Sequence, residues 1–267
     1  MSTVLLTGAS GRLGTHMRRW FAQKGRAVLA TDIRPAEDGG PVEIADLSDR
    51  EAVDRLMARD ISGVVHLGGM AKEAGWQMVL DANIIGSYNI FESARKAGVK
   101  RVVYASTYHV IGMYPTPSDT PLDLNASYRP DSLYAVSKAF GETLGRLYFD
   151  KFGIECLAIR ICTAGDPGTP REARLWLNRD DLATLIETGL DQPDLGHRIV
   201  YGVSDNPKPM VVNAPAPGLQ WAPVHGSEEL GSPDPLEPLD QSDARNRLLG
   251  GAFSTWGHQD DQGSEAD

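Results

Sequence analysis

A tyrosine and a lysine stand four residues apart in the stretch 131–142, DSLYAVSKAFGE. The stretch has helical periodicity, so Tyr134 and Lys138 project from one face of a helix about one turn apart. A free tyrosine has a pKa of about 10 and is a poor base at neutral pH, but an ammonium group beside it favours the phenolate. Tyr134 could then take a proton from a substrate hydroxyl while hydride leaves the same carbon. Such pairs also occur by chance on amphipathic helices, so the surrounding elements decide the case.

The predicted strand before this helix, residues 101–107, ends in two hydroxyl residues, Ser106 and Thr107. Ligands of open parallel sheets bind at the carboxyl ends of the strands. Thr107 could therefore hydrogen-bond a reacting oxygen, although a strand-end hydroxyl bonded to its own backbone is an equally good interpretation. The connection 113–130, rich in proline and aspartate, is long for a compact fold and is typical of a functional loop.

A glycine-rich turn, residues 7–14, lies between the apolar run 4–6 and a helical stretch. This order predicts a dinucleotide phosphate site, because glycines allow close backbone approach and a helix N-terminus presents free amides to a pyrophosphate. A bland turn can also contain three glycines, but here the motif opens a βαβ unit. The residues predicted to contact the cofactor are Gly8, Ser10, Gly11, Arg12, Leu13 and Gly14.

Asp32 ends the second predicted strand, about twenty residues after the turn, where a ribose-binding carboxylate belongs. It would accept hydrogen bonds from the ribose hydroxyls and repel a 2′-phosphate, which favours NAD over NADP. Arg34 leaves an alternative open, since an arginine can accommodate that phosphate, lie over the adenine or face solvent. Asp46 and Leu47 follow the third strand where they could touch the adenine, although Asp46 could equally be a turn residue.

The fourth predicted strand ends at Leu67 and is followed by Gly68 and Gly69. A backbone without side chains could lie against the cofactor there. The next predicted helix, 76–97, contains Asn83. A mid-helix asparagine is usually solvent-facing, so Asn83 gains interest only by resemblance.

Two arginines, Arg171 and Arg174, follow a glycine- and proline-rich loop after the sixth predicted strand, 155–161. They could clamp an anionic substrate group, but surface charge is the commoner fate of arginine. Other expected elements are a capping box, 48–51, that opens a helix to about residue 59, a helix 180–192 and a strand 198–203. We expect a domain over 1–205, a short C-terminal extension over 206–255 and a disordered tail over 256–267.

Composition excludes several classes of protein. The chain has 267 residues, 41% of them hydrophobic, which suits one large α/β domain. Its net charge of −10 and absence of a basic cluster argue against a nucleic-acid partner. No apolar run approaches membrane-spanning length, and the N-terminus enters a strand at once, so we expect a cytoplasmic protein without a signal peptide. Cys156, Cys162 and six scattered histidines have no metal-ligand spacing, so no metal is predicted.

Taken together, the glycine turn, Asp32, Thr107 and the Tyr134/Lys138 pair resemble the short-chain dehydrogenase/reductase superfamily, in its extended, epimerase-related branch. The resemblance implies a Rossmann-type α/β fold, a doubly wound parallel sheet with helices on both faces and here a short irregular C-terminal extension. Extended members that act on nucleotide sugars carry a larger C-terminal domain. The shorter chain suggests a small free substrate.

Several segments further resemble the bacterial uronate dehydrogenase family, whose members oxidise C1 of a hexuronic acid to an aldarolactone with NAD. They are 66–69, 83–86, 111–115, 134–142, 148–153, 180–181 and 250–253. The resemblance implies that Tyr134 is the base, that Lys138 binds the nicotinamide ribose and lowers the tyrosine pKa, and that Thr107 replaces the family's serine. It also implies cofactor contact by Asn83 and binding of the sugar carboxylate by Arg171.

The departures from this family lie among the residues expected to bind substrate. Tyr108 stands where the family has an asparagine, before His109; Ala71, followed by Lys72, and Thr163 stand where it has serines. Retained chemistry with a changed sugar is therefore an alternative, because lost hydroxyl contacts redirect specificity strongly. Lys72, Arg171 and Arg174 could serve a larger C6 anion, as in sulfoquinovose or glucose 6-phosphate.

Two alternatives come from other classes of protein: an epimerase or dehydratase that retains NAD, and a non-catalytic NAD sensor. The intact Tyr134/Lys138 pair argues against the sensor. We also expect a homo-oligomer, since apolar residues of the tyrosine helix could form either core or dimer face. These are Leu144, Leu147 and Phe149.

Overall fold

A parallel seven-stranded sheet forms the centre of the computed structural model, which describes residues 3–215 and 217–257. The strand order is β3-β2-β1-β4-β5-β6-β7, and every neighbouring pair is parallel. The order reverses direction at β1, next to β4, where ligands of doubly wound sheets bind. The strands are β1 (Thr3–Thr7), β2 (Val28–Asp32), β3 (Glu43–Ile44), β4 (Ile61–His66), β5 (Arg101–Thr107), β6 (Glu155–Ile161) and β7 (His197–Gly202). The predicted Rossmann-type fold is confirmed.

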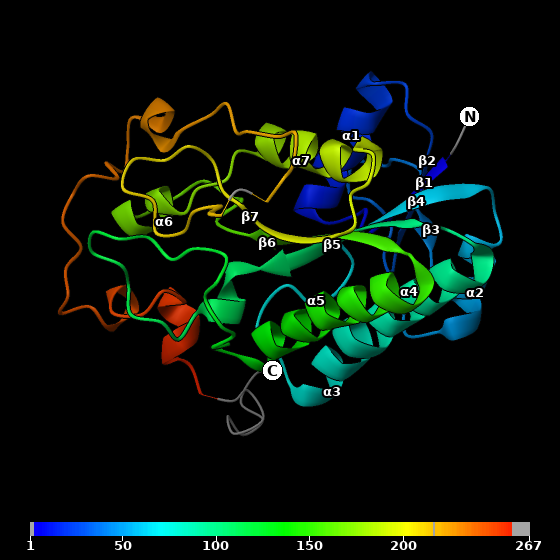
Figure 1. Ribbon diagram of the computed structural model, residues 1–267, viewed down its shortest axis with the longest axis horizontal. Helices are drawn as coiled ribbons and strands as arrows, with labels where there is room; N and C mark the ends of the chain where they lie inside the picture. The colour runs from blue at the N-terminus through cyan, green and yellow to red at the C-terminus, as the bar shows by residue number, and fades with distance from the viewer. Residues whose placement is uncertain (1–2, 216, 258–267) are drawn as a thin grey trace.

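Helices cover both faces of the sheet (Figure 1). One face carries α1 (Arg12–Gln23) and α7 (Arg179–Asp191), and the other carries α2 (Arg50–Met57), α4 (Gly86–Ala97) and α5 (Leu133–Phe152). The shorter helical segments are α3 (Trp76–Val79), the π-helix η1 (Leu80–Ile85), α6 (Pro170–Arg174) and the 3-10 turns η2 (Tyr108–Ile111), η3 (Ser227–Leu230), η4 (Ala244–Asn246) and η5 (Gly251–Thr255).

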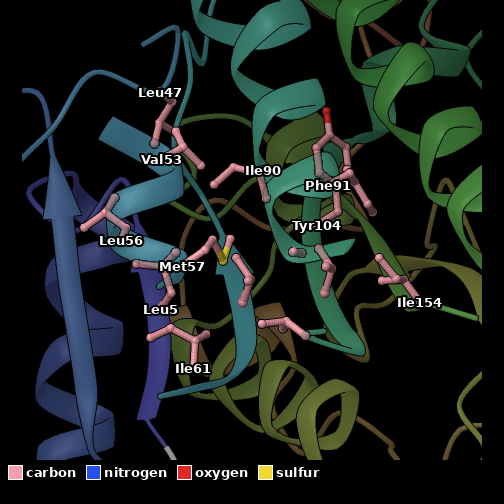
Figure 2. Packing of buried hydrophobic residues seen from close by; sticks show 14 of the residues in the cluster. Leu5, Leu47, Val53, Leu56, Met57, Ile61, Ile90, Phe91, Tyr104 and Ile154 are labelled. Atoms are coloured by element: carbon pink, nitrogen blue, oxygen red, sulfur yellow. The ribbon is translucent and has the colours of Figure 1, made fainter. Parts of the chain in front are cut away.

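Each face of the sheet buries its own apolar layer, as parallel strands covered on both sides require. Figure 2 shows the layer under α2 and α4, where Leu56 and Met57 of α2 lie near Leu5 of β1, and Phe91 of α4 lies beside Tyr104 of β5. The opposite layer packs α1 and α7 onto the sheet through residues such as Phe21 and Leu185. These two layers hold the strands in place. The residues that follow each strand are therefore held at the carboxyl edge of the sheet.

Two helix predictions need correction. Asp49, and not Ser48, caps α2, because its carboxylate accepts hydrogen bonds from the amides of Glu51 and Ala52. Ser48 instead bonds to Asp46. The helix predicted over 76–97 is interrupted by the π turn η1, which contains Asn83. Such turns are frequent at functional sites.

The C-terminal extension runs irregularly back across the connection 113–130 (Figure 1). Isolated bridges pair Leu122 with Val211 and Pro115 with Leu248. The chain then brings Phe253 to the carboxyl edge of the sheet, where its ring lies 4.6 Å from that of Trp256. From residue 258 on, the predicted tail lies outside the described residues. Across the residues that are described, the helices are all too short or too polar to span a membrane.

Candidate active site

A cavity of about 920 Å³ extends along the carboxyl edge of the sheet, from the glycine turn to the tyrosine helix. It brings together most residues predicted for cofactor and substrate. Those that line it are Gly8, Gly11, Arg12, Leu13, Gly14, Asp32, Arg34, Asp46, Leu47, Leu67, Gly68, Gly69, Ala71, Ser106, Thr107, Tyr108, His109, Tyr134, Lys138 and Thr163. Ser10, Lys72, Asn83, Arg171 and Arg174 are not among its lining residues.

The glycine turn at one end of the cavity is closely packed and fixed to β2. Gly8 has a φ of +69°, which disfavours other residues, and a Cβ on Gly14 would lie 2.1 Å from the Gly8 carbonyl oxygen. The Ser10 amide donates to Asp32 Oδ2 at 2.9 Å, and the Ser10 hydroxyl donates to the Arg34 carbonyl at 2.7 Å. Gly11, the N-cap of α1, makes no side-chain cap. The N-terminus of α1 therefore presents amides to the cavity beside a carboxylate at the end of β2, which fits a dinucleotide.

Asn83 supports the middle of the cavity. Its Oδ1 accepts from the Met70 amide at 2.7 Å, and its Nδ2 donates to the Met70 carbonyl at 3.0 Å and to Ser137 Oγ at 2.8 Å. A Cβ on Gly69 would lie 2.5 Å from Asn83 Oδ1. The side chain is buried, not solvent-facing, and ties the loop after β4 to α5.

The N-terminus of α5 places Tyr134 at the cavity wall. Ser132 caps the helix by accepting from the Ala135 amide at 3.1 Å. The buried carboxylate of Glu73, from the loop before α3, accepts from the Tyr134 amide at 3.0 Å. Thr107 and Tyr134 both line the cavity, and Lys138 Nζ lies 6.0 Å from the centroid of the Tyr134 ring. The three residues predicted for catalysis therefore converge.

Burial dominates the electrostatics of this cluster. It lowers the pKa of Lys138 to about 8, and it raises the pKa of Tyr134 to about 12 against the opposing effect of the Thr107 side chain. The pKa of Tyr134 therefore lies above its ordinary value, because desolvation of the phenolate outweighs the other influences. Lowering of this pKa by Lys138 stays a prediction. Burial, followed by the charge of Lys138, also lowers the pKa of His66 to about 3, so His66 stays neutral.

The opposite end of the cavity is aromatic. The His109 ring lies between Tyr108 and Phe253, with both centroid separations 4.2 Å. Its Nδ1 is 2.6 Å from Asp131 Oδ2. The Arg171 guanidinium lies near the Tyr108 hydroxyl and donates to the Leu249 carbonyl.

Two basic residues predicted for substrate lie away from the cavity. Arg174 donates to the carbonyls of Pro235 at 2.7 Å and Glu237 at 2.6 Å, so its charge holds the C-terminal extension. Lys72 is exposed. Within residues 3–215 and 217–257, no group of three or more His, Cys, Asp or Glu side chains could hold a metal ion.

Comparison with known proteins assigns the chain to a protein family. The profile of the NAD dependent epimerase/dehydratase family matches residues 4–198. The chain belongs to the NAD-dependent epimerase/dehydratase family. The sequence resemblance to that branch is confirmed.

Relatives within the epimerase/dehydratase family cover nearly the whole chain. Uronate dehydrogenase of Pseudomonas syringae pv. tomato is 39% identical over 256 residues, 94% of this chain and 92% of the relative. NAD-dependent glucose-6-phosphate dehydrogenase of Haloferax volcanii is 33% identical over 262 residues, 90% and 98% of the two chains. A crystal structure of an Agrobacterium tumefaciens uronate dehydrogenase variant complexed with NAD has a TM-score of 0.88 and 37% identity, covering 96% of this chain and 98% of that one.

Three of the residues at this site that the sequence did not predict contact predicted site residues or line the cavity beside them. They are Glu73, which contacts the Tyr134 amide, Asp131, which contacts His109, and Phe253, which lines the cavity. Each makes its contact with a residue distant along the chain. Only Phe253 carried a signal, since it lies in a segment that resembles the uronate dehydrogenase family.

Proposed function

We propose that this chain catalyses the NAD-dependent oxidation of C1 of a hexuronic acid to the lactone. The carrying observation is the single cavity that joins a dinucleotide-type turn and Asp32 to Thr107, Tyr134 and Lys138. The near full-length similarity to uronate dehydrogenases supports the substrate. NAD, when bound, accepts a hydride from C1.

The protein's own residues handle the proton. Thr107 and Tyr134 line the cavity together and receive the C1 hydroxyl. Before the sugar binds, Tyr134 releases its phenol proton to solvent; the phenolate then takes the proton of the C1 hydroxyl as C1 becomes a carbonyl. Lys138, one helical turn away, places a positive charge near the phenolate that must form transiently. Burial of all three excludes water from this step.

The acidic group at C6 is recognised at the Tyr108 end of the cavity. Tyr108 lines the cavity, and the positive charge of Arg171 acts on its hydroxyl, so a carboxylate against Tyr108 would lie near the guanidinium. Arg171 is 7% exposed, and its Nε is buried without a hydrogen-bond partner among the described residues. A carboxylate satisfies such a donor better than any neutral group.

One relative favours a second candidate, a hexose with a larger anion at C6. The Haloferax volcanii glucose-6-phosphate dehydrogenase is similar over almost its whole length. Against this candidate, only Arg171 of the three residues expected to serve a larger anion lies near the Tyr108 end of the cavity, whereas Arg174 binds the C-terminal extension and Lys72 is exposed. The uronate proposal therefore takes precedence.

The test is NADH formation by purified protein with NAD, followed by ultraviolet absorbance. Glucuronate, galacturonate, glucose, glucose 6-phosphate and sulfoquinovose are compared at equal concentrations. We expect turnover with the uronates. Preference for glucose 6-phosphate or sulfoquinovose would mean that the substrate is a sugar with a larger anion and not a uronate. Absence of NADH with all five sugars would favour an epimerase or dehydratase that retains its cofactor.

We propose a homo-oligomer built on the outer face of α4 and α5. Leu144 packs in the core, whereas Leu147 is 46% exposed, Val136 45% and Tyr88 45%. An apolar surface of this kind supports association. Light scattering coupled to gel filtration tests it, and a monomer at micromolar concentration would contradict it. The cytoplasmic location stays a prediction.

A further inference from the structure

Asp131 joins three parts of the site through one enclosed carboxylate. Its side chain has no exposed surface. Oδ2 lies 2.6 Å from His109 Nδ1, and Oδ1 accepts from the Ser132 hydroxyl at 2.8 Å. Ser132 is the N-cap of α5, two residues before Tyr134. The carboxylate thus connects the aromatic end of the cavity with the start of the tyrosine helix.

Two glycines make room for this carboxylate. A Cβ on Gly112 or on Gly250 would lie 1.9 Å from Asp131 Oδ2. Both glycines have ordinary helical dihedrals, with φ of −63° and −70°, so their backbones would accept alanine. A side chain at either position would therefore collide with the Asp131 carboxylate. The Gly250 amide also donates to the Gly112 carbonyl at 2.8 Å, which brings the C-terminal extension against Asp131.

The carboxylate also determines which nitrogen of His109 is available. When one ring nitrogen donates to a carboxylate, the other is left for a different partner. Asp131 occupies Nδ1, and the ring is held between Tyr108 and Phe253 at the cavity wall. Nε2 is thus the nitrogen that can meet a ligand.

We propose that Asp131 is a positioning residue for the proposed reaction, holding His109 so that Nε2 meets an oxygen of the sugar beside Tyr134. The role rests on the proposed function. The carboxylate keeps the proton of His109 on Nδ1 and fixes the distance between this ring and the N-terminus of α5. Asp131 itself contacts neither sugar nor cofactor.

Kinetics of Asp131→Asn provide the first test. Losing a charge-assisted hydrogen bond of this kind typically costs about 10- to 100-fold, and we expect that fall in kcat/KM for the uronate, with a raised KM. The dissociation constant for NAD should stay unchanged. Asp119→Asn, on the exposed part of the same connection, is the matched control and should behave as wild type. Wild-type kcat and KM in Asp131→Asn would overturn the proposal.

A double-mutant cycle tests the contact with the extension. Gly250→Ala should displace the carboxylate and lower kcat/KM, as Asp131→Ala does. In the Asp131→Ala background the same glycine substitution should add little, because its clash partner is gone. Additive losses would show that Gly250 acts independently of Asp131 and would overturn the coupling. Thermal unfolding of each variant separates loss of folded protein from loss of positioning.

A measurement without substrate separates this proposal from the proposed function. In histidine-15N-labelled protein, the His109 resonance, assigned with His109→Gln, should report a protonated Nδ1 in wild type and change in Asp131→Ala. An unchanged resonance would overturn the positioning role whichever sugar is oxidised. Absence of turnover with every uronate, together with the expected His109 resonance, would instead count against the proposed function alone.

Discussion

Lys138 Nζ lies 6.0 Å from the centroid of the Tyr134 ring and 5.2 Å from that of Tyr104. The ammonium group is thus held between two aromatic rings, both of them buried. Burial disfavours both the ammonium of Lys138 and the phenolate of Tyr134. At neutral pH the cluster therefore holds Tyr134 as a neutral phenol and Lys138 as an ammonium whose pKa lies below its ordinary value, and each shift has a measurable consequence.

Tyr134→Phe should lower kcat by at least ~100-fold, the usual scale for loss of a general base. The dissociation constant for NAD should change little, because the ring and the helix remain. Tyr88→Phe, on the exposed surface of α4, is the matched control. Turnover near wild type in Tyr134→Phe would exclude Tyr134 as the base.

Lys138→Met should change how stability depends on pH. The pKa of Lys138 is lowered to about 8 in the folded protein, so between that pH and the ordinary lysine value the unfolded chain binds more protons. The free energy of unfolding should therefore rise with pH through this window, by up to about 3 kcal/mol from this residue. Below pH 8 Lys138 is charged in both the folded and the unfolded chain, so the folded protein bears the full cost of burying the ammonium group.

Urea unfolding of wild type and Lys138→Met at pH 7, 8, 9 and 10 measures this effect as a difference between the two proteins. Taking the difference removes the effects of other titrating groups, such as the buried cysteines. A difference that stays constant across the window would contradict the lowered pKa of Lys138.

Asp32→Asn should weaken selection of NAD over NADP. The amide can still accept from the Ser10 backbone, but it no longer repels a 2′-phosphate and binds ribose hydroxyls less strongly. We expect kcat/KM for NAD to fall about tenfold and the ratio of NAD to NADP use to narrow. Glu37→Gln, exposed beside Arg34, is the control. An unchanged ratio of NAD to NADP use in Asp32→Asn would mean that residues other than Asp32 select the cofactor.

The sequence predicted those parts of the molecule whose signals are local. The bounds of β5 and β6 were predicted to the residue, and Gly98 and Gly153 end their helices in the left-handed conformation. In each case the residues that form the element also carry the pattern, as apolar runs or as a terminal glycine.

Contacts between distant segments could not be predicted in this way. The contact of Glu73 with the Tyr134 amide spans 61 residues, and nothing near Glu73 in the sequence indicates it. Asn83, in the π turn, is hydrogen-bonded to Met70 and Ser137, which only the fold brings close. Arg171 and Arg174 look alike in sequence, and their different roles become visible only from the path of the C-terminal extension, whose carbonyls bind Arg174.

Exchanging these two arginines for alanine should give opposite results. Arg174→Ala removes two charge-assisted hydrogen bonds to the extension, so the free energy of unfolding should fall by about 3 kcal/mol with little change in KM. Arg171→Ala should raise KM for the uronate at least ~10-fold, because the anion at C6 loses its charged partner. Urea unfolding and steady-state kinetics on both variants measure the contrast. An equal rise in KM for Arg174→Ala would mean that both arginines bind the substrate, and would reopen the case for a larger anion.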